Sequence, residues 1–158
     1  MPPLRYTALI HERLSTVLAF AYSWGHLHRL LTTKFKGEWK YLDKTINSIA
    51  PQKAIQAFIE ISGYLRLLDD AEDISGFLAR APGAKGVSFG RVLKKDGSEE
   101  PLYLRDLTNK IAHAKDWKWD VTEPDSPKLI CESNNPDRWV DAEIDIEAFA
   151  AFCGQLMH

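Results

Sequence analysis

The amino-acid sequence predicts an α+β fold, in which a helical N-terminal half is followed by a small antiparallel sheet of about three to four strands. In the first half, apolar residues recur at steps of three and four residues, which is typical of amphipathic helices. In the last third, apolar and polar residues alternate, which is typical of half-buried strands. A helical pattern precedes most of the alternating segments and another closes the chain, so we expect an inserted helix and a C-terminal helix. The 158 residues contain no long linker, and a single domain over residues 1–158 is expected.

The first half is expected to contain two long helices. After a non-helical start at residues 1–3, the pattern over residues 10–31 predicts a helix of roughly 25 residues. A short helix over residues 44–50 is expected to end at Pro51, where the second long helix begins and continues to about residue 68 or 71. The spacing assigns these residues to its core face: Ile55, Phe58, Ile59, Ser62, Leu65 and Leu68.

The second half begins with a helical turn at residues 74–78 and a loop at residues 82–86. A strand or half-hairpin is expected at residues 87–94, followed by a turn at Asp96 and Gly97. Residues 103–114 have the pattern of a helix with its apolar residues on one side, and this pattern predicts a buried face. The residues on that face are Leu104, Leu107, Ile111 and Ala114.

Three further strands are expected at residues 117–121, 128–132 and 139–146. In the last of these the alternation is strict, so one set of side chains should face the core and the other should not. The core set is Val140, Ala142, Ile144 and Ile146, and the opposite set is Trp139, Asp141, Glu143 and Asp145. Asp145 is then placed to cap a closing helix that runs to about residue 156.

The amino-acid composition argues against several classes of protein function. The net charge is −2, so the chain has no overall positive field that would attract nucleic acid or an anionic membrane surface. The only cysteines, Cys131 and Cys153, are too few for a disulfide framework, and the N-terminus lacks the order of a signal peptide. The apolar segment at residues 14–24 is too short to span a membrane. These observations predict a soluble, cytoplasmic protein with no membrane partner.

The candidate site lies on the helix at residues 103–114. Arg105, Asn109 and His113 step by four residues along a line away from the apolar face, so they project in roughly the same direction. Arginine supplies a forked charge, asparagine a neutral donor and histidine a proton carrier, which together predict an anion or phosphate site. In the alternative interpretation, Asn109 and His113 bond to the neighbouring loop or strand and fix the turn from helix to strand.

This arrangement resembles the signature of HEPN-type proteins, helical domains found in bacterial toxin and antiviral systems. The resemblance implies metal-independent RNA cleavage, commonly across a dimer, in which His113 moves protons and Arg105 steadies the phosphate. Asn109 would be the intervening polar residue. The seven residues between Arg105 and His113 are more than the family usually has, and the family is mostly helical. The segment LRDLTNKIAHA also resembles a segment of uncharacterised bacterial proteins, which implies no activity.

The remaining histidines and the acidic run are interpreted as structural or solvent-exposed groups. His26 and His28 are two residues apart and point to different sides of a helix, so they are interpreted as structural or surface histidines. The acidic run at residues 69–73 has carboxylates one turn apart that suit a hard cation, but a solvated helix end is the preferred interpretation. No metal site and no cofactor are predicted.

Aromatic residues next to lysines suggest a second class of contact. One cluster, at residues 34–44, interleaves lysines with Phe35, Trp39 and Tyr41, and such clusters can hold single-stranded nucleic acid. Trp117 and Trp119 form a second aromatic pair. In both places the alternative is a solvated lysine face over a packed aromatic core.

Two functions follow from these observations. The first is a non-catalytic domain that acts through protein partners or self-association, because no specific catalytic signature is present. The second is a HEPN-like metal-independent ribonuclease or RNA-binding protein that uses Arg105, Asn109 and His113, expected to act as a homodimer.

Overall fold

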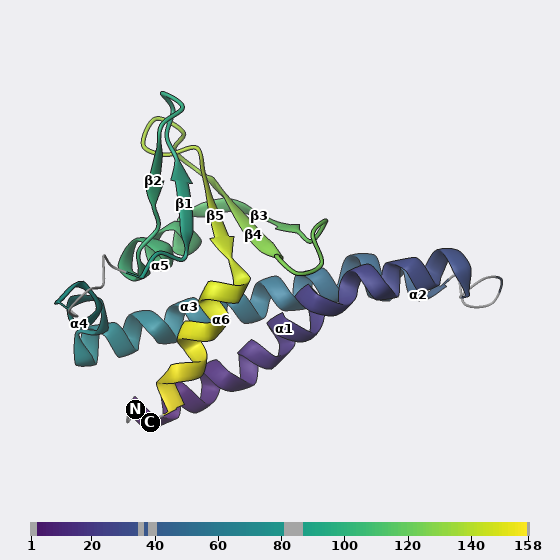
Figure 1. The fold of residues 1–158 in the computed structure, drawn as a ribbon, viewed down its shortest axis with the longest axis horizontal. Coiled ribbons are helices and arrows are strands. Elements are labelled where there is room, and N and C mark those ends of the chain that lie inside the picture. Colours follow the sequence, from purple (N-terminus) through teal and green to yellow (C-terminus); the bar gives the residue numbers. More distant parts are fainter. Residues whose placement is uncertain (1–2, 35–36, 38–40, 81–86, 158) are drawn as a thin grey trace.

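The structure, a computed structural model, describes residues 3–34, 37, 41–80 and 87–157 and has the predicted α+β architecture. A long helical hairpin forms the base of the molecule, and an antiparallel sheet stands on one of its faces (Figure 1). The expected loop at residues 82–86 and the first two residues of the chain lie outside the described ranges. Within those ranges, no helix combines the length and the apolar character that crossing a membrane requires.

The hairpin consists of α1 (Pro3–Thr33) and α3 (Ala50–Glu72), and α3 is preceded without a break by α2 (Leu42–Lys44) and a π-helical turn, η2 (Thr45–Ile49). The two long helices are antiparallel, since Tyr6 lies beside Tyr64 and His28 lies beside Asn47. Their contact is formed by buried apolar residues at helical spacing. These are Ile10, Leu14, Val17 and Ala21 from α1, with Ala57, Phe58, Ile61 and Leu65 from α3.

Two predictions about α3 and its approach were wrong. Pro51 does not end the preceding segment, because it lies in the first turn of α3, where a missing N–H costs little. The π-helical turn just before it changes the hydrogen-bond register, so that the chain stays helical through the proline. Ile59, assigned to the core face, is exposed, because α3 buries the side that faces α1 and α5.

The remaining elements are α4 (Ile74–Arg80), β1 (Gly90–Leu93), β2 (Glu99–Pro101), α5 (Leu104–Ala112), β3 (Ala114–Asp120), β4 (Lys128–Ser133), β5 (Asp141–Asp145), α6 (Ile146–Gly154) and η3 (Gln155–Met157). The five strands are all antiparallel, in the order β2-β1-β5-β4-β3. The strand that the sequence did not predict is β2, whose residues Glu99, Glu100 and Pro101 are all exposed. Charged residues and proline are typical of an edge strand and carry no alternation signal.

The two faces of the sheet differ in the way that the alternation predicted. The face toward the helices buries Val92, Leu129, Cys131, Ala142 and Ile144, and the opposite face is polar. On that outer face, Glu143 pairs with Arg91 at 3.1 Å and with Lys128 at 2.9 Å. Trp139 was assigned to the outer set but is buried, because β5 begins only at Asp141 and the tryptophan belongs to the preceding loop.

Asp145, the last residue of β5, holds the start of the C-terminal helix, and Gly90, the first residue of β1, allows β1 to approach β5 closely. Asp145 caps α6 as predicted, and its Oδ1 accepts from the backbone N–H groups of Glu147 at 2.9 Å and Ala148 at 3.3 Å. The helix then places Phe149 against Phe58 and joins the sheet to the hairpin. Gly90 has a φ of 148°, and a Cβ atom at this position would lie 1.9 Å from the carbonyl oxygen of Glu143.

Candidate functional site

The candidate site is built on α5, which is held in place by its apolar side. Leu104, Leu107 and Ile111 are buried, as predicted, and α5 packs against α3 on one side and against β4 and β5 on another. The helix is shorter than predicted because β3 begins at Ala114, so His113 is the C-terminal cap rather than an internal residue. The backbone N–H of His113 donates to the carbonyl oxygen of Asn109 at 3.0 Å.

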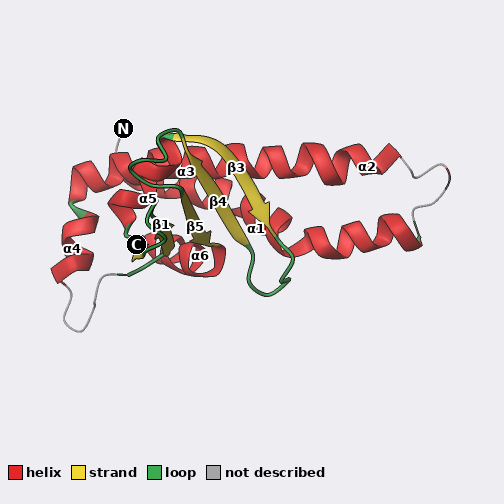
Figure 2. Ribbon diagram, turned by 90° about the horizontal axis from the view of Figure 1, so that it is seen from above, coloured by secondary structure: helices red, strands yellow, loops and turns green. Residues whose placement is uncertain are grey.

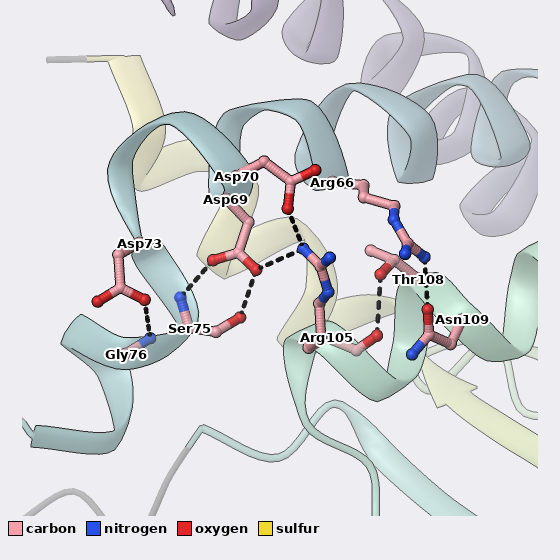
Figure 3. A network of polar contacts seen from close by, with 9 residues as sticks. All are labelled: Arg66, Asp69, Asp70, Asp73, Ser75, Gly76, Arg105, Thr108 and Asn109. Atoms are coloured by element: carbon pink, nitrogen blue, oxygen red, sulfur yellow. Dashed lines mark hydrogen bonds and ion pairs between the residues drawn. The ribbon is translucent and has the colours of Figure 1, made fainter.

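Arg105 points toward the end of α3 (Figure 3). Its Nη1 donates to Asp70 Oδ1 at 2.6 Å and to Asp69 Oδ2 at 3.2 Å. The hydrogen bond to Asp70 is the main cause of a raised pKa for the Arg105 guanidinium, and the bond to Asp69 adds to it. The positive charge of Arg105 is therefore already paired with two carboxylates within the protein.

Asp69 is a structural residue. Its side chain is 7% exposed, and it accepts from the backbone N–H of Ser75 at 2.6 Å and from the Ser75 hydroxyl at 2.8 Å. These bonds hold the start of α4 against the end of α3, where Asp73 turns the chain with a φ of 51°. The interpretation of the acidic run as a solvated helix end is wrong for Asp69, although Asp70, Glu72 and Asp73 are exposed. The described residues contain no group of histidine, cysteine and carboxylate side chains placed to hold a metal ion.

Asn109 is oriented by Arg66 of α3. Arg66 Nη1 donates to Asn109 Oδ1, and Figure 3 shows the amide nitrogen of Asn109 pointing away from that contact. Since a guanidinium can only donate, the contact fixes which end of the amide is the oxygen. The amide N–H₂ group of Asn109 is therefore directed away from α3 as a donor.

His113 and Asn109 line a pocket of about 620 Å³, whereas Arg105 does not. His113 is exposed, and its imidazole has no hydrogen-bond partner in the described part of the chain. The structure thus brings together two of the three residues that share a line on the helix, while the third turns toward α3. We call this cavity the polar pocket. Its lining residues are Lys94, Asp106, Asn109, Lys110, His113, Asn134, Asn135, Arg138 and Trp139.

Sequence reasoning missed the half of the polar pocket that does not come from α5. Lys94 follows β1, and the segment between β4 and β5 supplies Asn134, Asn135 and Arg138. The sequence Asn134–Asn135–Pro136–Asp137 predicts a turn. The signal for a site is the pair of asparagines followed by Arg138 in one short loop, but nothing in the local sequence indicates that this loop folds over the end of α5.

The remaining polar candidates have structural partners. His28 stacks on Trp24 with ring centres 4.6 Å apart, and His26 Nδ1 lies 2.9 Å from Arg29 Nη2. Burial raises the pKa of both Cys131 and Cys153 to about 12, which leaves their thiols protonated and poorly nucleophilic at neutral pH.

Of the two aromatic clusters, the structure describes the pair formed by Trp117 and Trp119. Trp119 packs on Phe20 with ring centres 5.1 Å apart, and its Nε1 donates to the carbonyl oxygen of Pro51 at 3.0 Å. This tryptophan therefore packs under the helices, as the structural alternative predicted. Residues 35–36 and 38–40 of the lysine and aromatic cluster, which include Phe35 and Trp39, lie outside the described residues.

An apolar groove is the second cavity of interest. It lies between α1 and the segment that joins η2 to α3, and its volume is about 480 Å³. It begins at the sheet, because Phe20 in the groove also contacts Trp119. Its apolar lining residues are Ala19, Phe20, Trp24, Leu27, Ile46 and Ala50, with Ser15, Thr16, Ser23, Thr45 and Lys53 among them.

Comparisons of the chain with protein-family models, with curated proteins and with solved structures give no match. The likeness to HEPN-type proteins therefore remains a resemblance of one helix.

Proposed function

We propose that this chain is a non-catalytic binding domain that acts through a protein partner or a second copy of itself. The observation that carries the proposal is the apolar groove between α1 and the η2–α3 segment. In Figures 1 and 2, the α2 end of the hairpin extends beyond the sheet, so none of the strands in the described ranges covers this part of the helices. Half-buried aromatic and aliphatic side chains in a preformed depression are typical of the centre of a protein interface.

The groove has the composition expected of such a centre. Trp24 and Leu27 are half-buried in the described fold, and Lys53 and the small hydroxyl residues form a polar border. Tyr22 of α1 and Ile49 of η2 are also exposed. Covering this surface would remove apolar area from water, which favours association at roughly 25 cal/mol per Å² before the costs of ordering are subtracted.

The same geometry gives less support to RNA cleavage by Arg105 and His113, the second function that the sequence predicts. In that reaction Arg105 would steady the phosphate while His113 moves protons, but the Arg105 guanidinium bonds to Asp69 and Asp70 instead. Releasing it would leave the buried Asp69 carboxylate with an unmatched charge. We therefore propose binding rather than catalysis.

Self-association is tested by sedimentation velocity over a range of protein concentrations. Leu27→Glu places a charge in the groove and is expected to reduce the dimer population. Ile59→Glu makes a similar change at an exposed position of α3 that does not line the groove, and it should leave the dimer unchanged.

A different protein partner is tested by photo-crosslinking in the cells that produce the chain. A photoreactive residue in place of Ser23, at the groove, should give a discrete adduct that Leu27→Glu removes. The same residue in place of Lys118, on the charged outer face of the sheet, should not give it. A chain that stays monomeric and forms no adduct at position 23 would contradict the proposal.

RNA cleavage is tested with a mixed-sequence single-stranded RNA in EDTA, comparing the native chain with His113→Ala at matched circular dichroism. We expect no cleavage above the background of the variant. Cleavage by the native chain that the variant lacks would instead establish a metal-independent nuclease that depends on His113.

A further inference from the structure

The polar pocket concentrates positive charge in a protein that is negative overall. Three cationic side chains, Lys94, Lys110 and Arg138, line it together with one carboxylate, Asp106. The net charge of the pocket is therefore +2 with His113 neutral, whereas the net charge of the chain is −2. A cavity lined by one sign of charge attracts ligands of the opposite sign.

The single carboxylate of the pocket is already neutralised. Lys110 Nζ lies 2.8 Å from Asp106 Oδ1, one turn away on α5. The same ammonium group lies 5.0 Å from the centre of the Trp139 ring, so the tryptophan also holds it in place. Asp106 therefore contributes little repulsion toward an entering anion.

Arg138 is the available cation of the pocket. Lys94 shares its charge with Glu100 at 3.3 Å, but the Arg138 guanidinium has no ion pair or side-chain hydrogen bond within the described part of the chain. It is exposed and is carried by a loop held by backbone bonds, including the bond from its own N–H to the Asn135 carbonyl at 3.0 Å. Five N–H donors in a planar fork are thus presented without a partner.

Amide groups add neutral donors from two directions. Arg66 holds the oxygen of Asn109, which leaves the N–H₂ group of this residue as its available hydrogen-bonding group. Asn134 and Asn135 are exposed on the opposite loop, and no side-chain hydrogen bond ties up either amide within the described residues. The donors thus come from α5 and from the loop between β4 and β5.

We propose that the polar pocket binds a phosphate group, carried either by a phosphorylated small molecule or by the 5′ end of an RNA. A terminal phosphate has three acceptor oxygens and close to two negative charges, which match donors that converge from several directions and the net charge of the pocket. The volume of about 620 Å³ suits a ligand of nucleotide size. Trp139 is 6% exposed and lies under Lys110, so it offers no open face for stacking, and the phosphate is the recognised group. This site is separate from the apolar groove and does not depend on the function proposed for it.

Isothermal titration calorimetry with inorganic pyrophosphate, and with one RNA oligonucleotide bearing either a 5′-phosphate or a 5′-hydroxyl, tests the proposal. We expect binding that Arg138→Gln weakens by about tenfold, the usual effect of losing one charge-assisted hydrogen bond. Arg5→Gln removes the same charge from an exposed position on α1 and should leave the affinity unchanged. Both arginines are exposed, and circular dichroism would verify that both variants fold.

The two phosphate sources are separated by their relative affinities. Tighter binding of pyrophosphate indicates a phosphorylated small molecule, and tighter binding of the 5′-phosphorylated RNA indicates an RNA end. The proposal is overturned if neither binds, if both forms of the RNA bind equally and pyrophosphate does not bind, or if the two arginine variants weaken binding to the same extent. It is also overturned if an acidic peptide binds at Arg138 and pyrophosphate does not.

Discussion

Arg105 on α5 and Asp69 on α3 lie 36 residues apart in the sequence, yet Arg105 Nη1 donates to Asp69 Oδ2 at 3.2 Å. The same carboxylate accepts two hydrogen bonds from Ser75 at the start of α4. One buried side chain thus joins three helices, and this contact gives Arg105 a structural role.

Asp69→Ala should lower the free energy of unfolding by about 2 kcal/mol, because it removes the acceptor of two hydrogen bonds from Ser75 in the first turn of α4 and the carboxylate to which Arg105 donates. Urea denaturation followed by circular dichroism measures the loss. The matched variant is Asp70→Ala, which removes an exposed partner of the same arginine and should cost less. Equal losses in the two variants would show that Asp69 has no special role.

Ile144→Asp should unfold the domain, since Ile144 is fully buried and an uncompensated charge there costs several kcal/mol. Thermal denaturation would show the loss of a cooperative transition. Ile130→Asp is the control, because it makes the same change on the outer face of the neighbouring strand, opposite Lys118. An unchanged melting temperature for Ile144→Asp would mean that the strand register is wrong.

Gly90→Ala should destabilise the sheet by about 3 kcal/mol, because the added Cβ would meet the backbone oxygen of Glu143 and the residue would keep a positive φ. Gly63→Ala in α3 is the opposite case, since no atom lies within 4 Å of the new Cβ. This second variant should gain about 0.5–1 kcal/mol from helix propensity. Denaturation curves of the two variants that shift in the same direction would contradict this account.

Cys131 and Cys153 should resist alkylation in the folded protein, because burial raises the pKa of each thiol to about 12 and excludes the reagent. Mass spectrometry after treatment with iodoacetamide would detect labelling in denaturant only. Labelling of either thiol in native buffer at the denatured rate would show that the sheet or α6 opens readily.

The raised pKa values of Cys131 and Cys153 predict that the folded protein loses stability at alkaline pH. Their folded-state pKa lies above the ordinary value of 9.0, so the protonated thiols contribute stability that is fully present below pH 9.0. This contribution is lost as the pH rises from 9.0 toward about 12, because the unfolded state then releases protons that the folded state retains. Urea midpoints measured from neutral to alkaline pH would follow it, and Cys131→Ala should make the decline less steep.

The sequence by itself determined the features that depend on neighbouring residues. The alternation around Ala142 and Ile144 gave the correct buried face of β5, and the step from Leu104 to Leu107 and Ile111 gave the buried face of α5. The cap at Asp145 was also predictable. For the two buried faces, the hydrogen-bond pattern of the strand or helix fixes which side chains share a face, so periodicity is sufficient. The cap depends only on Asp145 and the two N–H groups that follow it closely in the sequence.

The tertiary structure determined which side chains that are distant in the sequence come into contact. Arg105 and His113 share a line on α5, but Asp69 and Asp70 of α3 engage the first, while the second lines a pocket with Arg138 from another loop. Periodicity gives the direction of a side chain from its own helix and carries no information about charges tens of residues away. Those partners depend on how α3, α5 and the β4–β5 loop pack together, and that packing is set by the shared apolar core.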